Sequence, residues 1–192
     1  EEDVCSVEDC DIGARVGLRW PKGPFEAFNH TGPRIALEWT TGAIARYRDL
    51  KLPSRLVEAG RSNTPLRLRS VQYSVDDGIG RIVINRPDAL NALNEDVVKQ
   101  LGDAFDALLH DDKAKAIVIA GAGKAFVAGA DTRFFVEQIE KGDIDRIVRF
   151  AADGQELFRR IDNSPKTVIC QLDGLSLGGG TELALACDHI VA

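Results

Sequence analysis

The residues best suited to chemistry lie in the segment LSLGGGTELALA, residues 175–186. Three consecutive glycines, 178–180, stand before Thr181, Glu182 and a run of helix-forming residues. Backbone N–H groups in the first turn of a helix have no partner within the helix, and the helix dipole adds partial positive charge there. Because glycine has no side chain, a ligand oxygen can approach these N–H groups closely. The segment therefore indicates a site for a phosphate or a developing oxyanion, with Glu182 near enough to reach the same ligand.

Other interpretations of the glycine triplet compete with the oxyanion site. A P-loop does not fit, because the segment GAGKAF (121–126) lacks both the first glycine and the Ser or Thr of that pattern. The dinucleotide-binding pattern also fails, because Leu183 stands where its third glycine is required. Close packing of a strand against a helix through small residues remains an equally good explanation of the triplet taken alone.

A second turn of small residues lies in the segment AFVAGAD, residues 125–131, after the buried strand expected over 116–121. Ala128, Gly129 and Ala130 leave their backbone N–H groups with little steric cover. Two such turns can direct two N–H donors at one carbonyl oxygen. That arrangement is an oxyanion hole, which stabilises an enolate or a tetrahedral intermediate.

Strand-like and helix-like patterns alternate after residue 70, which predicts an α/β layered fold. A hairpin with the turn DDGI is expected to join the first two strands. Asn94 is expected to cap the amphipathic helix that follows them, which carries Val97, Leu101, Phe105 and Leu108 on one face. Residues 121–135 read as a glycine- and alanine-rich loop, and DHIVA at the end reads as a strand just beginning. The expected strands span 71–75, 80–85, 116–121 and 166–174, and the expected helices span 94–111, 143–161 and 178–188.

The first 60 residues read as a helical segment without strands. A capping pattern at Ser6 and Asp9 begins the first helix, and the segment WPKGPFE (20–26) breaks it with two prolines and a glycine. The expected helices span 6–18, 32–50 and 53–60. Residues 61–70 read as a linker, so the expected domains are 1–60 and 71–192.

The composition of the 192-residue chain, 44% apolar and 28% charged, is typical of a soluble globular protein. No apolar run approaches the roughly 18 residues of a membrane helix, so no membrane partner is expected. The basic stretch 32–70 has no aromatic platform, so no nucleic-acid partner is expected. The four cysteines show no zinc spacing, so no metal site is expected and a cytoplasmic location is favoured. The lack of Met and the strand begun at the end indicate a piece of a longer protein.

Three blocks of sequence together resemble the enoyl-CoA hydratase/isomerase, or crotonase, superfamily. They are NRPDALNAL (85–93), AFVAGAD (125–131) and DGLSLGGGTELALACD (173–188), and their order and spacing also fit. The resemblance covers roughly residues 70–192. It implies repeated ββα units, here truncated at the C-terminus and preceded by an α-helical segment. It also implies a coenzyme A thioester substrate, and hydration of that thioester requires neither a metal nor a redox cofactor.

The same resemblance implies roles for individual residues. It places the oxyanion-hole N–H groups at Ala130 and Gly179, and makes Glu182 one of two carboxylates that handle water and the α-proton. The residues that it places along the acyl-CoA site are Ala89, Leu90, Ala128, Gly129 and Asp131. For Asp131, a structural role in holding the loop is the preferred interpretation. The second carboxylate of the hydratases, and the C-terminal helices that complete a trimer or a dimer of trimers, would lie beyond residue 192.

Residues 5–26, CSVEDCDIGARVGLRWPKGPFE, resemble part of the C-terminal helical domain of 3-hydroxyacyl-CoA dehydrogenases. Together the two resemblances imply a fragment of a dehydrogenase–hydratase fusion acting in fatty-acid β-oxidation. The alternatives that remain open are a Δ3,Δ2-enoyl-CoA isomerase and a non-catalytic acyl-CoA-binding or assembly module.

Overall fold

The computed structural model of the chain describes residues 5–47, 51–66 and 68–192. The chain divides into two compact units, residues 1–68 and residues 69–192, and each is described by itself. The last residues of the helix expected over 32–50, namely 48–50, lie outside the described residues. Residue 67 of the expected linker and residues 1–4 of the expected first domain also lie outside them.

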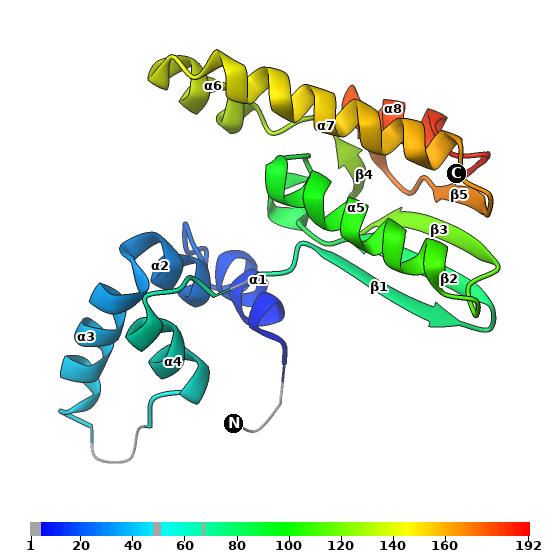
Figure 1. Cartoon of the computed structure of the whole chain (residues 1–192). Coiled ribbons are helices and arrows are strands. Elements are labelled where there is room, and N and C mark those ends of the chain that lie inside the picture. Colours follow the sequence, from blue (N-terminus) through cyan, green and yellow to red (C-terminus); the bar gives the residue numbers. More distant parts are fainter. Residues whose placement is uncertain (1–4, 48–50, 67) are drawn as a thin grey trace. The chain divides into compact units, whose positions relative to one another are not determined.

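The described residues of the first unit form helices joined by short turns (Figure 1). They are α1 (Val7–Gly17), α2 (Pro24–Thr31), α3 (Pro33–Ile44) and α4 (Ser54–Ser62). A small core of Phe28, Ala36 and Ala59 holds α2, α3 and α4 together. The Ser6 hydroxyl accepts the Asp9 N–H at 3.0 Å, so the predicted cap of α1 is confirmed.

Helix α1 ends at Gly17, so the break predicted at the segment WPKGPFE is confirmed, and the same segment also begins α2, which the sequence analysis did not predict. Pro24 occupies the first turn of α2, where a missing N–H costs nothing. The N–H groups of Phe25 and Glu26 donate to the Asp11 carboxylate at 2.7 and 2.9 Å. Because the capping residue Asp11 belongs to α1, the sequence next to the prolines does not predict the start of α2.

The second unit consists of three successive ββα units followed by a last short strand, so the expected fold class is confirmed. The first comprises β1 (Val71–Asp76), β2 (Ile79–Ile84), the 3₁₀ turn η1 (Pro87–Ala89) and α5 (Glu95–His110). The second comprises β3 (Ala116–Gly121), β4 (Ala125–Ala128), α6 (Thr132–Lys141) and α7 (Ile144–Asp162). The third comprises β5 (Thr167–Gln171), β6 (Leu175–Leu177) and α8 (Gly179–Leu185), and β7 (His189–Val191) follows.

The strands form two sheets. The larger sheet has the order β1-β2-β3-β5-β7, in which β1 is antiparallel to β2 and the other neighbours are parallel. The predicted hairpin is confirmed, with Asp77 and Gly78 at positive φ in its turn. The smaller sheet pairs β4 with β6 in parallel.

Residues 121–135 were expected to form a loop, and that expectation was wrong. They contain β4 and the start of α6. The strand β4 has only four residues, and it pairs with β6, which lies about fifty residues further along the chain, so a local pattern did not reveal it. The helix α6 begins with Thr132 directly after its cap, Asp131.

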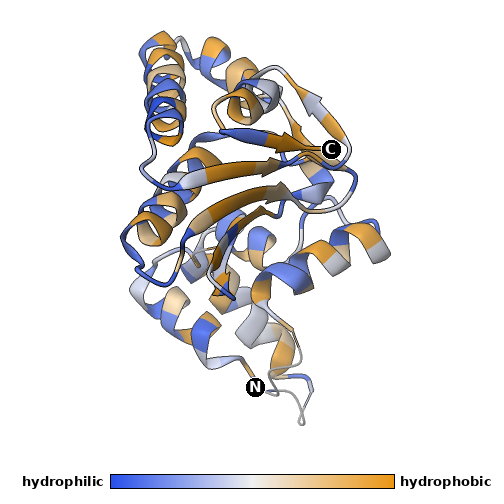
Figure 2. Cartoon of the chain, turned by 90° about the vertical axis from the view of Figure 1, so that its right-hand side faces the viewer, coloured by the Kyte–Doolittle hydropathy of each residue, from blue (hydrophilic) through white to orange (hydrophobic). Residues whose placement is uncertain are grey.

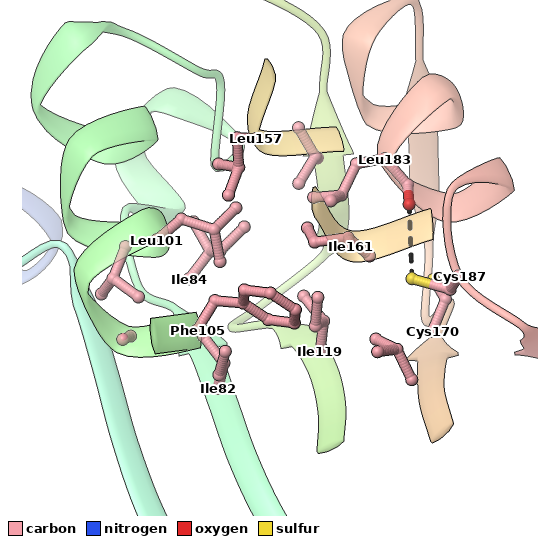
Figure 3. Packing of buried hydrophobic residues seen from close by; sticks show 14 of the residues in the cluster. Ile82, Ile84, Leu101, Phe105, Ile119, Leu157, Ile161, Cys170, Leu183 and Cys187 are labelled. Carbon is pink, nitrogen blue, oxygen red and sulfur yellow. Dashed lines mark hydrogen bonds between the residues drawn. The ribbon is translucent and has the colours of Figure 1, made fainter. Parts of the chain in front are cut away.

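The core of the second unit lies between the larger sheet and helices α5 and α7 (Figure 3). Val97, Leu101, Phe105 and Leu108 form the buried face of α5, as the amphipathic pattern predicts. The sheet contributes Ile82, Ile84, Ile119 and Cys170, and α7 contributes Leu157 and Ile161. Figure 2 shows the apolar strands and the two-sided character of the helices. Among the helices of the described residues, none is both long enough and apolar enough to cross a membrane.

Candidate active site

The glycine triplet stands where β6 gives way to α8. Gly178 is the N-cap, with φ +44° and ψ −120°, a conformation that side-chain-bearing residues rarely adopt. Gly179 is the first helical residue, as the sequence predicts. Gly180 is buried so closely against β4 that an added Cβ would collide with the Val127 carbonyl oxygen. Close packing therefore accounts for one glycine of the three.

The turn after β4 is held from one side by residues that precede α5. The Leu93 N–H donates to the Gly129 carbonyl at 2.8 Å, and the Asp131 N–H donates to the Leu93 carbonyl at 2.7 Å. This is the pattern of a parallel bridge between Leu93 and Ala130. In such a bridge the middle residue turns its own N–H and C=O away from the partner. The Ala130 N–H therefore faces away from Leu93.

The two turns lie against each other. Ala128 pairs with Leu177, and a Cβ on Gly178 would lie 4.0 Å from the Gly129 Cα. In the described residues, no backbone carbonyl accepts a hydrogen bond from the N–H of Ala130 or of Gly179. Both residues are half-buried. The site thus presents two unpaired donors on adjoining segments, which an incoming oxygen atom can satisfy.

Glu182 lies one turn into α8, three residues beyond Gly179. Its side chain is exposed, while the neighbouring Leu183 and Ala184 are buried and anchor the helix to the core. The Glu182 N–H donates to the Gly178 carbonyl at 3.0 Å. The carboxylate is therefore open to solvent on a helix whose other face is fixed.

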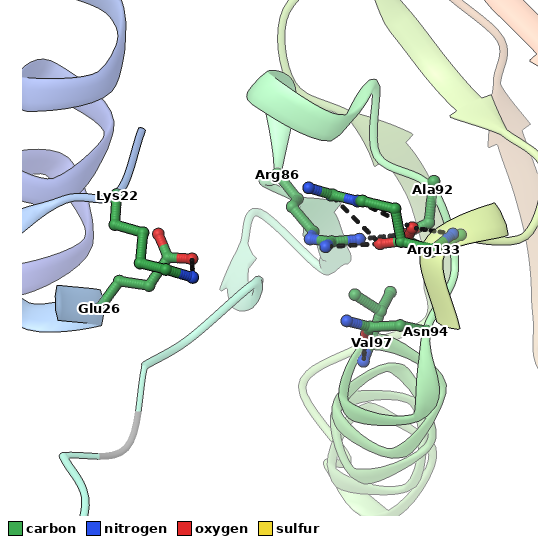
Figure 4. A network of polar contacts seen from close by, with 8 residues as sticks. Lys22, Glu26, Arg86, Ala92, Asn94, Val97 and Arg133 are labelled. Carbon is green, nitrogen blue, oxygen red and sulfur yellow. Dashed lines mark hydrogen bonds and ion pairs between the residues drawn. The ribbon is translucent and has the colours of Figure 1, made fainter. Parts of the chain in front are cut away.

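Asp131 is buried and makes the contacts of a carboxylate that holds a loop. It caps α6 by accepting the Arg133 N–H at 3.1 Å, and it accepts the Arg86 guanidinium at 2.7 Å. The Arg133 side chain also approaches it, at 3.3 Å (Figure 4). Burial raises the pKa of Asp131, but the hydrogen bonds and charges of Arg86 and Arg133 outweigh burial and hold that pKa below its ordinary value.

Ala89 is the last residue of η1 and Leu90 follows it, beside the end of β4. The Leu90 carbonyl accepts the Ala128 N–H at 3.0 Å, so this turn and β4 are in direct contact. The Leu90 side chain is 43% exposed, and its φ of +50° is unusual for leucine. Strained backbone of this kind persists only where the surroundings impose it.

Two residues of the NRPDALNAL segment have structural roles that the sequence analysis did not assign. Arg86 pairs with Asp131. The buried Asn91 accepts the Arg86 N–H in its own turn and donates to the Ala122 carbonyl in the link between β3 and β4. A polar residue between apolar neighbours, of a type that tolerates positive φ, was the available signal for Asn91. The partner of Arg86 is distant in the sequence, so no local pattern could identify it.

No group of three or more His, Cys, Asp or Glu side chains that could hold a metal ion occurs in residues 5–47, 51–66 and 68–192. The four cysteines, which are Cys5, Cys10, Cys170 and Cys187, form no disulfide bond.

Comparison with known proteins gives a consistent answer. A sequence model of the enoyl-CoA hydratase/isomerase family matches residues 79–192. The chain is similar to crotonyl-CoA hydratase of Syntrophomonas wolfei, with 39% identity over 118 residues, 61% of this chain and 44% of that protein. It is also similar to human mitochondrial delta(3,5)-delta(2,4)-dienoyl-CoA isomerase, with 37% identity over 130 residues, 64% of this chain and 38% of that protein.

A solved structure of an enoyl-CoA hydratase/isomerase from Xanthobacter autotrophicus matches with a TM-score of 0.59 and 32% identity, over 65% of this chain and 46% of that one. The chain spans less than half the length of these proteins. The family match covers more than half of this chain, and it includes both turns of the site and the ββα units that carry them. The chain belongs to the enoyl-CoA hydratase/isomerase family.

Proposed function

We propose that the protein containing this chain is an enoyl-CoA hydratase, which adds water across the double bond of a 2-enoyl-CoA thioester. The observation that carries the proposal is the pair of unpaired N–H groups, at Ala130 and Gly179, on two turns in contact. Similarity to a crotonyl-CoA hydratase at 39% identity supports the same reaction.

In the proposed reaction, water adds to the β-carbon and negative charge develops on the thioester oxygen. The N–H groups of Ala130 and Gly179 stabilise that charge, each by about 3 kcal/mol if they resemble measured oxyanion donors. Glu182 acts as one of two carboxylates that activate water and deliver the α-proton. The thioester lies along Ala89, Leu90, Ala128 and Gly129, and Asp131 holds the loop beneath it. This acid–base chemistry needs no cofactor, because the acyl group is already carried as a coenzyme A thioester.

Isomerisation is the second candidate, and similarity to a dienoyl-CoA isomerase at 37% identity favours it. An isomerase needs the same oxyanion hole, because it also passes through an enolate. It differs in moving a proton within the acyl chain without adding water. A non-catalytic acyl-CoA-binding module would bind the thioester and catalyse neither reaction.

The decisive experiment incubates the full-length protein with crotonyl-CoA and follows the absorbance of the conjugated thioester. A hydratase removes that absorbance and forms 3-hydroxybutyryl-CoA, and Glu182→Gln abolishes turnover but keeps acyl-CoA binding, because an amide cannot take a proton. Conversion of a 3-enoyl-CoA to the conjugated isomer, with no hydration of enoyl-CoAs of any chain length, would establish the isomerase instead. Binding without either reaction would establish the binding module.

We further propose that residues 1–60 are a remnant of a 3-hydroxyacyl-CoA dehydrogenase C-terminal domain, joined through residues 61–70 to the crotonase-like residues 71–192, in a cytoplasmic fusion protein. The separate helical unit supports this arrangement. The full-length fusion would reduce NAD with 3-hydroxybutyryl-CoA. Residues 1–60 should not bind NAD, because their described part contains helices and no strand followed by a glycine-rich turn and a helix. Micromolar binding of NAD to the 192-residue chain in calorimetry would contradict this.

A homo-oligomer, a trimer or a dimer of trimers, is also proposed. Several large apolar side chains on α6 and α7 are more than half exposed, which is typical of surfaces that pack against another subunit. They are Val136, Ile139, Ile144 and Val148. Light scattering of the full-length protein would give the number of subunits.

A further inference from the structure

We infer that Arg86 and Asn91 are positioning residues for the oxyanion hole. They fix the turn of residues 86–93 against residues 129–131, so that the Ala130 N–H keeps the direction that the reaction needs. The inference rests on the proposed function, because it assigns a task to residues around the same site. Neither side chain is placed in contact with the substrate.

Asn91 is a fully buried junction between the turn and the loop that links β3 to β4. Its Nδ2 donates to the carbonyls of Ala122 and Ala125, at 2.9 and 2.8 Å. Its Oδ1 accepts the Arg86 N–H at 2.8 Å. A neutral amide supplies two donor hydrogens and one acceptor oxygen, so these bonds use both sides of its chemistry. An aspartate could not donate to the two carbonyls.

Arg86 connects the same turn to the segment after β4. One terminal nitrogen donates to the Ala92 carbonyl at 3.0 Å, and the other donates to the Asp131 carboxylate at 2.7 Å (Figure 4). The planar guanidinium holds these two directions at once, which the single ammonium of a lysine does less well. Asp131 has only 9% of its side chain exposed, so solvent screens the pair weakly.

The contacts of Arg86 affect the direction of the Ala130 N–H. Leu93 bonds to the residues on either side of Ala130 and leaves the Ala130 N–H facing the other way. Arg86 holds both ends of this bridge, since Ala92 precedes Leu93 and Asp131 follows Ala130. Displacing either end would rotate the peptide that carries the donor. A misplacement of about 1 Å at a reacting centre can cost on the order of 100-fold in rate.

The test uses the full-length protein with Arg86→Met, which removes both bonds, and Arg86→Lys, which keeps the charge. Asp106→Asn is the matched control, because it breaks the Arg160–Asp106 pair between α5 and α7, far along α5 from the turn. We expect kcat to fall by about 10- to 100-fold for Arg86→Met with KM changed by less than about threefold. Arg86→Lys should recover part of kcat, and the control should keep the kcat of the wild type.

A second measurement does not depend on turnover. The thioester C=O stretching frequency of bound butyryl-CoA drops when hydrogen-bond donors polarise the carbonyl. We expect Arg86→Met to lose part of that drop while it still binds the ligand, and the control to keep it. If the wild-type protein hydrates no enoyl-CoA but Arg86→Met still loses part of the wild-type frequency drop, the proposed function fails and the positioning role stands.

Three results would overturn the inference. One is a wild-type-like kcat and carbonyl frequency in a folded Arg86→Met protein. Another is a fall in kcat that accompanies a fall in melting temperature and is the same in Arg86→Met and Asp106→Asn. That result would show that the Arg86 contact supports only the stability of the fold. The last is a carbonyl frequency of butyryl-CoA bound to the wild-type protein that equals the frequency of a thioester without hydrogen-bond donors.

Discussion

At Gly180, an added methyl group would meet the Val127 carbonyl oxygen, and the helix α8 could not stay where it is. At Gly178, φ of +44° excludes most side chains for a different reason. Gly179 meets neither restriction, because an added Cβ would lie 3.4 Å from the Leu93 Cδ1, at the edge of ordinary contact. Packing and backbone conformation therefore explain two of the glycines, and neither requires a glycine at position 179.

This difference predicts opposite behaviour for neighbouring substitutions. In the full-length protein, Gly179→Pro removes the proposed donor, while proline suits the first turn of a helix. We expect turnover to fall by about 100-fold or more with the melting temperature nearly kept. Gly179→Ala, which retains the N–H, is the control and should lose much less activity. Gly180→Ala should lower the melting temperature first, and activity only along with it.

Thermal melts and steady-state rates on the same three variants decide between the roles. Near-normal turnover in Gly179→Pro would end the assignment of its N–H as an oxyanion donor. Equal losses of stability in Gly179→Pro and Gly180→Ala would mean that packing explains both glycines.

At the scale of elements, the sequence predicted the helices and strands that are determined by residues close to one another in the chain. The cap Asn94 and the buried face of α5, the hairpin of β1 and β2, and the start of α8 at Gly179 all depend on residues within a turn or two. The strand β4 and the helix α2 were missed because each depends on a distant partner, β6 and Asp11 respectively. For the same reason the two turns of the proposed oxyanion hole could be suspected from their small residues, while the contact of Arg86 with Asp131 could not be predicted.

The helix α6 offers a prediction about pH. Its cap, Asp131, has a pKa that burial raises but that Arg86 and Arg133 lower further, to below the ordinary value. A carboxylate of this kind adds stability above its unfolded pKa of about 3.9, and that stability is lost as the pH falls through the lower folded pKa. The free energy of unfolding should therefore fall with pH in this acidic range more steeply in the wild type than in Asp131→Asn.

Urea unfolding at a series of pH values from about 5 downward measures this slope. Asp112→Asn, at an exposed aspartate, is the control and should keep the wild-type slope. If Asp131→Asn also keeps it, the pairing with Arg86 contributes nothing to the stability of the loop.

At the scale of the whole molecule, the proposed site lies at a seam between repeats. The turn with Ala130 belongs to the second ββα unit and Gly179 to the third, and the pairing of β4 with β6 joins them. The first ββα unit adds the turn of residues 86–93, which contacts Ala130 through the Leu93 bridge. A site composed in this way needs all three units folded together, which their shared core provides.

The helical residues before 69 have a core of their own, and this separation is testable. Asp11→Ala leaves the N–H groups of Phe25 and Glu26 without their acceptor, at a cost of about 1–3 kcal/mol to the helical unit. Leu101→Ala empties part of the other core, at a cost of about 2–5 kcal/mol. Hydrogen exchange followed by mass spectrometry should show faster exchange only before residue 69 in the first variant and only after it in the second. Faster exchange on both sides of residue 69 in either variant would contradict the division of the chain into two compact units, each with a core of its own.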